Sequence, residues 1–192
     1  MSESKPVLKV IVASVRDGRK GRAVADWYAA EAEKHGTFDV QIADLKEIDL
    51  PLMTEPNHPR LKQYTQDKTW EWSRTIDEAD AFAFVMPEYN HSLAAPLANA
   101  IDYLSQEWQY KPATIVCYGG VSGGQRAAQE LRTRLVALSV VSMPGLVALP
   151  MFAQHINDDD LFEGYDLANI AAKDSLDAMA KWHPALKTLR EG

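Results

Sequence analysis

The chain has 192 residues, of which 46% are hydrophobic and 24% are charged, and it contains ten Gly, ten Pro and one Cys. This composition is typical of a globular domain, and it excludes a mainly disordered or collagen-like chain. The formal net charge of −7 argues against broad nonspecific binding to nucleic acids or anionic membranes, which attract positively charged proteins.

The length and the cysteine content limit the number of domains and the cellular compartment that we expect. We expect a single domain over residues 1–192, because this length suits one domain and no flexible linker interrupts it. The lone Cys117 cannot form an intrachain disulfide, which favours a reducing compartment, by default the cytoplasm. No apolar run reaches the length of a signal peptide or a membrane span, so we expect neither.

The first predicted elements are a strand, a helix and a second strand. Residues 7–13 form an apolar, β-branched run typical of a buried parallel strand, and residues 22–35 follow with helical periodicity and Gly36 in place to end the helix. Residues 38–43 alternate between apolar and polar side chains, which predicts a strand near an edge of the sheet. Three prolines make residues 46–68 an irregular connection.

The middle of the chain repeats the alternation of helix and strand. We expect a helix over residues 70–79 and a buried strand over residues 81–86 that Pro87 ends. Residues 96–108 carry an apolar stripe at helical spacing, and residues 113–118 form another apolar strand. Trp108, at the end of the stripe, is a candidate for a dimer contact.

After the glycine-rich segment that follows, the pattern predicts a helix over residues 125–138 and a fifth strand over residues 139–143. An acidic turn lies at residues 157–160. A long helix is expected over residues 167–189, kinked or split at His183-Pro184. Five strands that alternate with helices predict βαβ units and a three-layer α/β fold, with a parallel sheet covered by helices on both faces.

In an open α/β sheet, ligands bind beyond the carboxyl ends of the strands, where three loops of this chain lie: residues 14–21, 87–92 and 119–124. The first loop and the residue after it carry four cations and one acid, a local charge of +3, which predicts an anion site at the start of a helix. Ser14 adds a hydroxyl donor. The cations are Arg16, Arg19, Lys20 and Arg22, and the acid is Asp17.

Two other interpretations of the first loop remain. In one, the loop is a solvated basic turn. In the other, Asp44, which lies outside the loop at the end of the second strand, acts like the ribose-binding acid of a dinucleotide fold. Neither the GxGxxG nor the GxxxxGK[ST] pattern occurs in the chain, which favours a single phosphate over a dinucleotide or a triphosphate.

The other two loops supply surfaces for a flat ligand. Tyr89 and His91 offer ring faces, and the Asn90 amide can both donate and accept hydrogen bonds. The segment GGVSGG lets backbone N–H groups approach a ligand closely through Gly119, Gly120, Gly123 and Gly124.

These motifs together resemble the NADPH-dependent FMN reductase family of flavodoxin-like proteins. The resemblance covers about residues 7–145 and is carried by ASVRDGRKGRAVADW, MPEYNHSLAAPLANAIDYL, EWQYKP and YGGVSGGQRAAQELR, in this order.

The resemblance implies a flavodoxin-like sheet of five parallel strands in the order 2-1-3-4-5. It implies bound FMN, NAD(P)H as the electron donor, and hydride transfer through FMN to a small-molecule acceptor such as free flavin or a quinone. It also implies a homodimer or a homotetramer. The cofactor-binding residues that it implies are Ser14, Arg16, Arg19, Lys20, Gly21 and Arg22 for the phosphate, Pro87, Glu88, Tyr89, Asn90 and Ser92 beside the ring, and Gly119, Gly120, Gly123 and Gly124 at its pyrimidine edge.

No side chain is predicted to act as an acid, base or nucleophile, because the flavin carries the redox chemistry. No metal site is predicted, because the histidines lack ligand spacing with acids or cysteine. Cys117, inside an apolar strand, is expected to be an inert packed thiol. Two alternative functions are an FMN-binding electron carrier or sensor without nicotinamide turnover, and a cofactor-free interaction module on the same fold.

Overall fold

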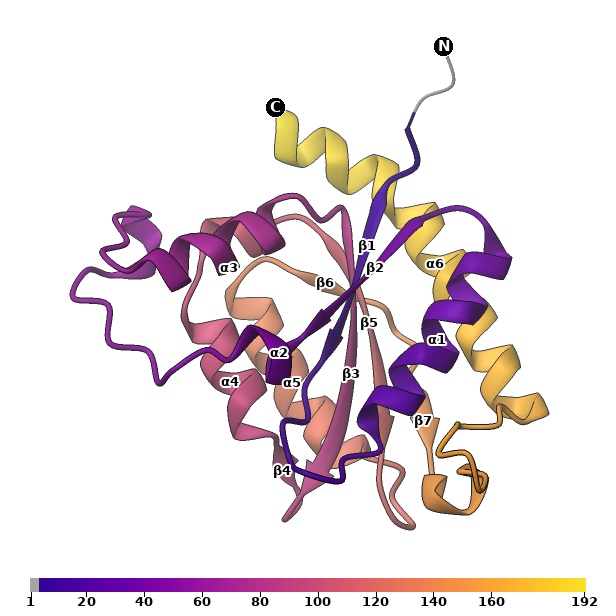
Figure 1. The fold of residues 1–192 in the computed structure, drawn as a ribbon. Helices are drawn as coiled ribbons and strands as arrows, with labels where there is room; N and C mark the ends of the chain where they lie inside the picture. The colour runs from indigo at the N-terminus through magenta and orange to yellow at the C-terminus, as the bar shows by residue number, and fades with distance from the viewer. Residues whose placement is uncertain (1–3) are drawn as a thin grey trace.

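The computed structural model describes residues 4–192 and places a parallel sheet between two layers of helices (Figure 1). The order β2-β1-β3-β5-β6 confirms the expected flavodoxin-like arrangement, with the alternating second strand at an edge. The strands of this path are β1 (Val7–Val12), β2 (Asp39–Asp44), β3 (Ala81–Tyr89), β5 (Pro112–Tyr118) and β6 (Val141–Ser142).

The sheet has seven strands rather than the expected five. β4 (Ser92–Leu93) folds back antiparallel on the end of β3, and β7 (Val147–Leu149) pairs with the last residues of β5. The fifth strand, expected over residues 139–143, is only two residues long. It ends just before Met143 and Pro144. The chain then returns to the same edge of β5, where it forms β7.

Pro87 does not end its strand, contrary to expectation, because β3 continues to Tyr89. The carbonyl of Val85 accepts a hydrogen bond from Ala13, on the β1 side. Residue 87 faces the same side, since alternate residues of a strand point their backbone groups the same way. The ladder with β1 ends at the pair of Val12 and Val85, so the missing N–H of Pro87 breaks no ladder bond.

The helices divide between the two faces of the sheet. α1 (Gly21–His35) and α6 (Asp166–Glu191) pack together on one face. The other face carries α2 (Leu45–Ile48), α3 (Asp67–Asp77), α4 (Ala95–Asp102) and α5 (Gln125–Ala137). α1 matches its prediction, and Gly36 ends it at φ 80° with its N–H bonded to the carbonyl of Ala32.

Other helices differ from the prediction. The helix expected over residues 96–108 ends at Asp102, and a separate 3-10 turn, η2 (Gln106–Trp108), follows it. α6 runs unbroken through Pro184, so the predicted split is absent. The irregular connection contains α2 and the 3-10 turn η1 (Pro59–Leu61). Within residues 4–192, no helix combines the length and the apolarity that crossing a membrane requires.

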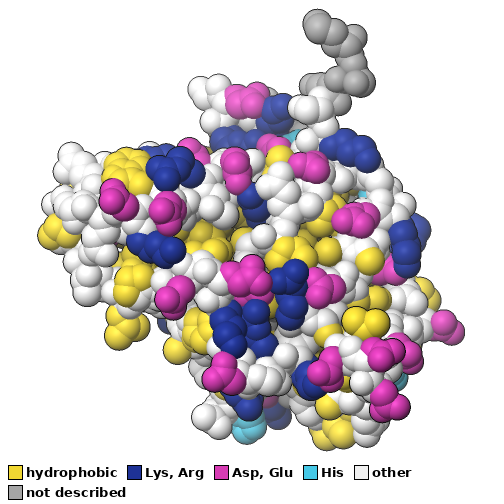
Figure 2. Space-filling view, in the orientation of Figure 1, with side chains coloured by type: hydrophobic (Ala, Val, Ile, Leu, Met, Phe, Trp, Pro, Cys, Tyr) yellow, Lys and Arg dark blue, Asp and Glu magenta, His cyan; other side chains and the backbone are white. Residues whose placement is uncertain are grey.

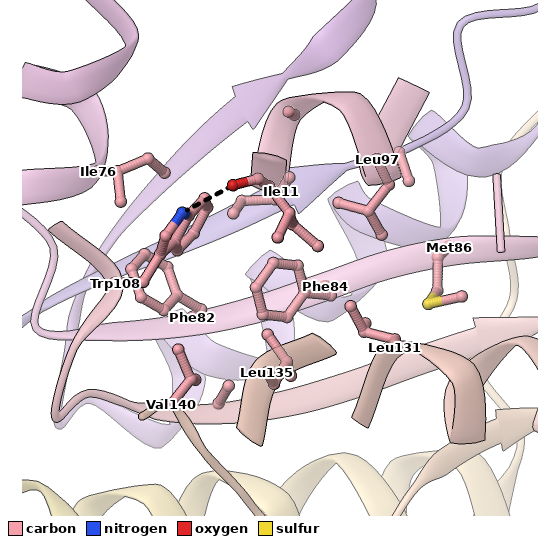
Figure 3. Close-up of a cluster of buried hydrophobic side chains, with 14 of the residues drawn as sticks. Ile11, Ile76, Phe82, Phe84, Met86, Leu97, Trp108, Leu131, Leu135 and Val140 are labelled. Carbon is pink, nitrogen blue, oxygen red and sulfur yellow. Dashed lines mark hydrogen bonds between the residues drawn. The ribbon is translucent and has the colours of Figure 1, made fainter. Parts of the chain in front are cut away.

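The core on the α3–α5 face is built around aromatic rings (Figure 3). Trp108 lies edge-on to Phe82, with ring centroids 5.0 Å apart, and its indole N–H donates to the carbonyl of Ile101. Trp72 lies against the same indole. Because Trp108 is fully buried within the subunit, the expectation that it forms a dimer contact is wrong.

Candidate functional site

The three predicted loops meet beyond the carboxyl ends of β1, β3 and β5, around a cavity of about 250 Å³. Larger hollows lie elsewhere, for example between α1 and α6, but none of them is lined by two of these loops. The lining residues are Ser14, Arg16, Gly18, Arg19, Lys20, Pro87, Glu88, Tyr89, Tyr118, Gly119 and Phe152.

Three hydroxyl groups gather at the start of α1. The Ser14 Oγ lies 2.8 Å from the Tyr89 hydroxyl and also beside the hydroxyl of Tyr118. Burial raises the pKa of Tyr118, so its hydroxyl stays protonated and able to donate. A β-carbon on Gly21 would lie 2.1 Å from the Tyr118 oxygen, which shows how closely this hydroxyl approaches the helix. The arrangement brings together hydroxyl groups from the loop after β1 and from the ends of β3 and β5.

Arg19 is held by carboxylate and carbonyl groups of the protein itself. Both terminal nitrogens of Arg19 bind the Asp44 carboxylate, one of them at 2.6 Å, and the other also donates to the carbonyl of Ser14 at 2.7 Å. Burial of Asp44 acts to raise its pKa, but the bonds from Arg19 and the backbone outweigh this and lower it. Asp44 is therefore committed to Arg19 and to the cap of α2, and the ribose-binding interpretation of Asp44 fails.

Lys20 and Arg22 of the loop and the nearby Lys46 are paired as well, so the fold balances most of the charge of +3 seen in the sequence. Figure 2 shows basic and acidic side chains interleaved on this face rather than a single basic patch. The pairs join Lys20 to Asp160, Arg22 to Asp26, Asp44 and Glu47, and Lys46 to Asp17.

Arg16 differs from the other three cations of the loop. It has no carboxylate partner within residues 4–192, and its guanidinium lies 5.6 Å from the centre of the Tyr89 ring. In the first turn of α1, the backbone N–H groups of Gly21, Arg22 and Ala23 also lack acceptors among the described residues. A free guanidinium, three hydroxyls and a helix N-terminus are the donors that a phosphate monoester needs. The residues present therefore fit the phosphate of FMN.

The second loop is a hairpin between β3 and β4. Asn90 and His91 form its tip with φ of 50° and 66°, a left-handed pair that suits a tight hairpin turn, and both side chains are exposed.

Two carboxylates fasten this hairpin to α5. Glu88 accepts hydrogen bonds from Ser122 and from the backbone and side chain of Arg126. Burial acts to raise the pKa of Glu88, but these donors lower it overall. Glu130 accepts from the hydroxyl of Ser92 and the N–H of Leu93, which lower its pKa. The second and third loops are thus held in one arrangement by ion pairs and hydrogen bonds.

In the third loop, packing within the protein requires two of the glycines. Gly123 and Gly124 have positive φ, and a β-carbon at either would lie within 3.0 Å of backbone atoms of Pro150 or of Tyr118. Gly119 lines the cavity, whereas Gly120 faces open space.

The structure brings about half of the sequence-predicted residues to the cavity wall. Those on the wall are Ser14, Arg16, Arg19, Lys20, Pro87, Glu88, Tyr89 and Gly119, and those outside it are Gly21, Arg22, Asn90, Ser92, Gly120, Gly123 and Gly124. Three further residues line the cavity without having been predicted from the sequence: Gly18, Tyr118 and Phe152. The rings of Tyr118 and Phe152 pack with centroids 4.6 Å apart. The position of Tyr118 as the last residue of β5 was an available signal, but nothing in the sequence pattern pointed to Phe152.

Cys117 lies in β5 below the site and is buried. Burial raises the pKa of its thiol to about 12, so the thiol stays protonated and unreactive. Within residues 4–192, no group of three or more His, Cys, Asp or Glu side chains is arranged to hold a metal ion.

The sequence of this chain is similar to those of known proteins. The model of the family "NADPH-dependent FMN reductase" matches residues 7–154. An NAD(P)H-dependent FMN reductase of Schizosaccharomyces pombe is 40% identical over 126 residues, which span 65% of this chain and 63% of that protein. A second one, from a Nectria species, is 35% identical over 153 residues, 76% of each chain.

Solved structures show the same fold. The flavoenzyme NAD(P)H:(acceptor) oxidoreductase FerB from Paracoccus denitrificans aligns over 94% of this chain and 98% of its own, with a TM-score of 0.74 and 22% identity. A flavodoxin from the domain Archaea aligns over 93% of this chain and 99% of its own, with a TM-score of 0.57 and 16% identity.

Proposed function

Because the chain belongs to the NADPH-dependent FMN reductase family, we propose that it is an FMN-dependent oxidoreductase that moves a hydride from NAD(P)H to a small-molecule acceptor. Free flavin and quinones are the acceptor classes that the names of the relatives support, since these include FMN reductases and an NAD(P)H:quinone oxidoreductase of Solanum tuberosum.

The observation that carries this proposal is the donor cluster at the start of α1. Arg16, Ser14 and Tyr89 line one cavity, and the first turn of α1, with its free N–H groups, begins directly after the lining residue Lys20. They lie beside the hairpin and the glycine-rich loop, at the strand ends where an open α/β sheet binds its ligands. A ligand with a phosphate at one end and a flat ring at the other fits this arrangement.

Each loop then has its own role. Ser14, Arg16 and the first turn of α1 hold the phosphate, and residues 87–92 and 119–124 border the ring. Bound FMN supplies the hydride-accepting chemistry. Protein groups bind and orient the cofactor, and the hydrogen bond from Ser122 to Glu88 joins the two ring-binding loops.

We also propose a domain organisation, an oligomeric state and a cellular compartment for the enzyme. Residues 1–192 form one FMN-binding domain, and the protein works as a homodimer or a homotetramer. The cytoplasm is its compartment, which the single buried cysteine supports.

The test is a visible absorption spectrum of the purified protein, followed by anaerobic titration with NADPH and then NADH. We expect flavin absorption that either donor bleaches and an added quinone restores. Protein that is colourless and does not bind added FMN would contradict the proposal. Bound FMN that sustains no repeated oxidation of NAD(P)H would instead identify an electron carrier.

A further inference from the structure

An acid from a distant part of the chain contacts one of the residues that line the cavity. The Asp160 carboxylate forms an ion pair with the ammonium of Lys20, which precedes α1 and lines the cavity. Asp160 lies 140 residues beyond Lys20, outside the part of the chain that the family model matches. This contact introduces a negative charge next to a site that offers donors to an anion.

A compact turn holds Asp160 in place. The Asn157 side chain accepts hydrogen bonds from the N–H groups of Asp159 and Leu161, and Asp160 adopts a left-handed φ of 63°. The segment is anchored to α1 because Phe162 packs on Trp27, with ring centroids 5.1 Å apart. The backbone position of Asp160 is therefore determined by the fold and does not depend on its ion pair.

Of the two paired cations on the cavity wall, Arg19 and Lys20, Lys20 can exchange its partner more easily. The Lys20 side chain is 39% exposed and that of Asp160 is 74% exposed, whereas the Asp44 side chain that binds Arg19 is 1% exposed. Exposed ion pairs contribute little to stability, so an incoming phosphate can compete for Lys20. Arg19 lacks this freedom, because its departure from Asp44 would leave the buried carboxylate without its partner.

We propose that Asp160 sets the affinity of the site for the cofactor phosphate by competing with it for Lys20. This inference rests on the proposed FMN site. With Asp160 neutralised, Lys20 turns to the phosphate and the repulsion between carboxylate and phosphate disappears. The segment after β7 thereby determines how strongly the site distinguishes FMN from riboflavin, which has the same ring and no phosphate.

The experiment measures the dissociation constants of FMN and riboflavin with cofactor-free protein, by quenching of flavin fluorescence at an ionic strength of about 0.15 M, where the screening length is only about 8 Å. It compares the parent protein with Asp160→Asn and with Asp159→Asn, which removes the same charge from the same turn but has no ion-pair partner within residues 4–192. Asparagine also tolerates the left-handed conformation, so both variants should fold. Thermal unfolding of each variant checks this.

We expect Asp160→Asn to bind FMN about two- to fivefold more tightly, the range that an exposed ion pair allows, with riboflavin affinity unchanged. Asp159→Asn should change FMN affinity by less than about 1.5-fold, because its carboxylate is screened by solvent. In a Lys20→Gln background, the effect of Asp160→Asn should shrink to the part that comes from direct repulsion between the carboxylate and the phosphate.

Two results would overturn the inference. One would leave the proposed function intact, and the other would refute it as well. Equal effects of Asp160→Asn and Asp159→Asn, in a protein that prefers FMN to riboflavin, would refute the role of Asp160 and leave the proposed function intact. Equal affinity of the parent protein for FMN and riboflavin would refute the phosphate site itself, and with it both proposals.

Discussion

The hydroxyl oxygen of Tyr118 lies 2.1 Å from the point where a β-carbon on residue 21 would stand, so only glycine fits at the start of α1. This contact joins the end of β5 to the first turn of the helix. It seats the tyrosine hydroxyl beside Ser14, within the donor cluster. Gly21 therefore contributes to the site through its lack of a side chain.

Gly21→Ala should destabilise the protein by about 1–3 kcal/mol, because the added methyl overlaps a buried side chain. Urea unfolding measures this change. Adding Tyr118→Phe should recover only part of the loss, since the ring carbon that carries the hydroxyl still lies 3.1 Å from the new methyl. Gly145→Ala is the matched control, as a β-carbon there meets nothing within 4 Å. Equal costs at both glycines would rule out the tyrosine contact as the cause.

Arg16 and Arg19 should separate in function, although they lie three residues apart. Arg16→Ala should weaken FMN binding by about 10- to 100-fold, the range of one charge-assisted contact, with little change in stability. Arg19→Ala should lower the free energy of unfolding, because it leaves the Asp44 carboxylate buried without its main partner. Flavin fluorescence and urea unfolding measure the two effects. A loss of FMN affinity confined to Arg19→Ala would reverse the assignment.

The pair of Arg19 and Asp44 predicts a specific dependence on pH. The pKa of Asp44 is lowered in the folded protein, so its stabilising contribution is complete above its unfolded pKa, about 4, and is lost as the pH falls through the folded value. Asp44→Asn should cost about 1.5–3 kcal/mol at neutral pH. The difference from the parent protein should stay constant from pH 5 to 7 and shrink below about pH 4. Unfolding at each pH tests this, and a difference that grows on acidification would contradict it.

Glu88 and Arg126 should be energetically coupled, because their ion pair connects the hairpin to α5. A double-mutant cycle of Glu88→Gln and Arg126→Gln should give a coupling of about 0.5–1 kcal/mol, the upper part of the range for a pair with one exposed partner. The pair of Arg134 and Asp102, exposed on both sides and also on α5, serves as the control and should couple less. Hydrogen exchange should also accelerate for residues 119–124 in Glu88→Gln. Unchanged exchange there would show that the loops do not depend on this contact.

The layers of the fold could be predicted because the first strands and the helices that follow them each show their own periodicity of apolar residues. The run at residues 7–13 and the helix before Gly36 needed only local pattern and a turn residue. The errors fall where distant segments decide the outcome. Pro87 continues a strand because β1 ends before it, and the fifth strand breaks in two along the edge of β5.

The sequence by itself determined the α/β architecture, the three loops at the strand ends and the residue types that suit a phosphate, since spacing along the chain encodes these. Only the tertiary structure decided which of the loop cations are free to bind the phosphate. Asp44 and Asp160 reach Arg19 and Lys20 from remote parts of the chain, whereas Arg16 meets no carboxylate in the described residues. Electrostatic interaction depends on distance in space, so a cluster of charge in the sequence becomes a binding site only where the fold leaves it unpaired.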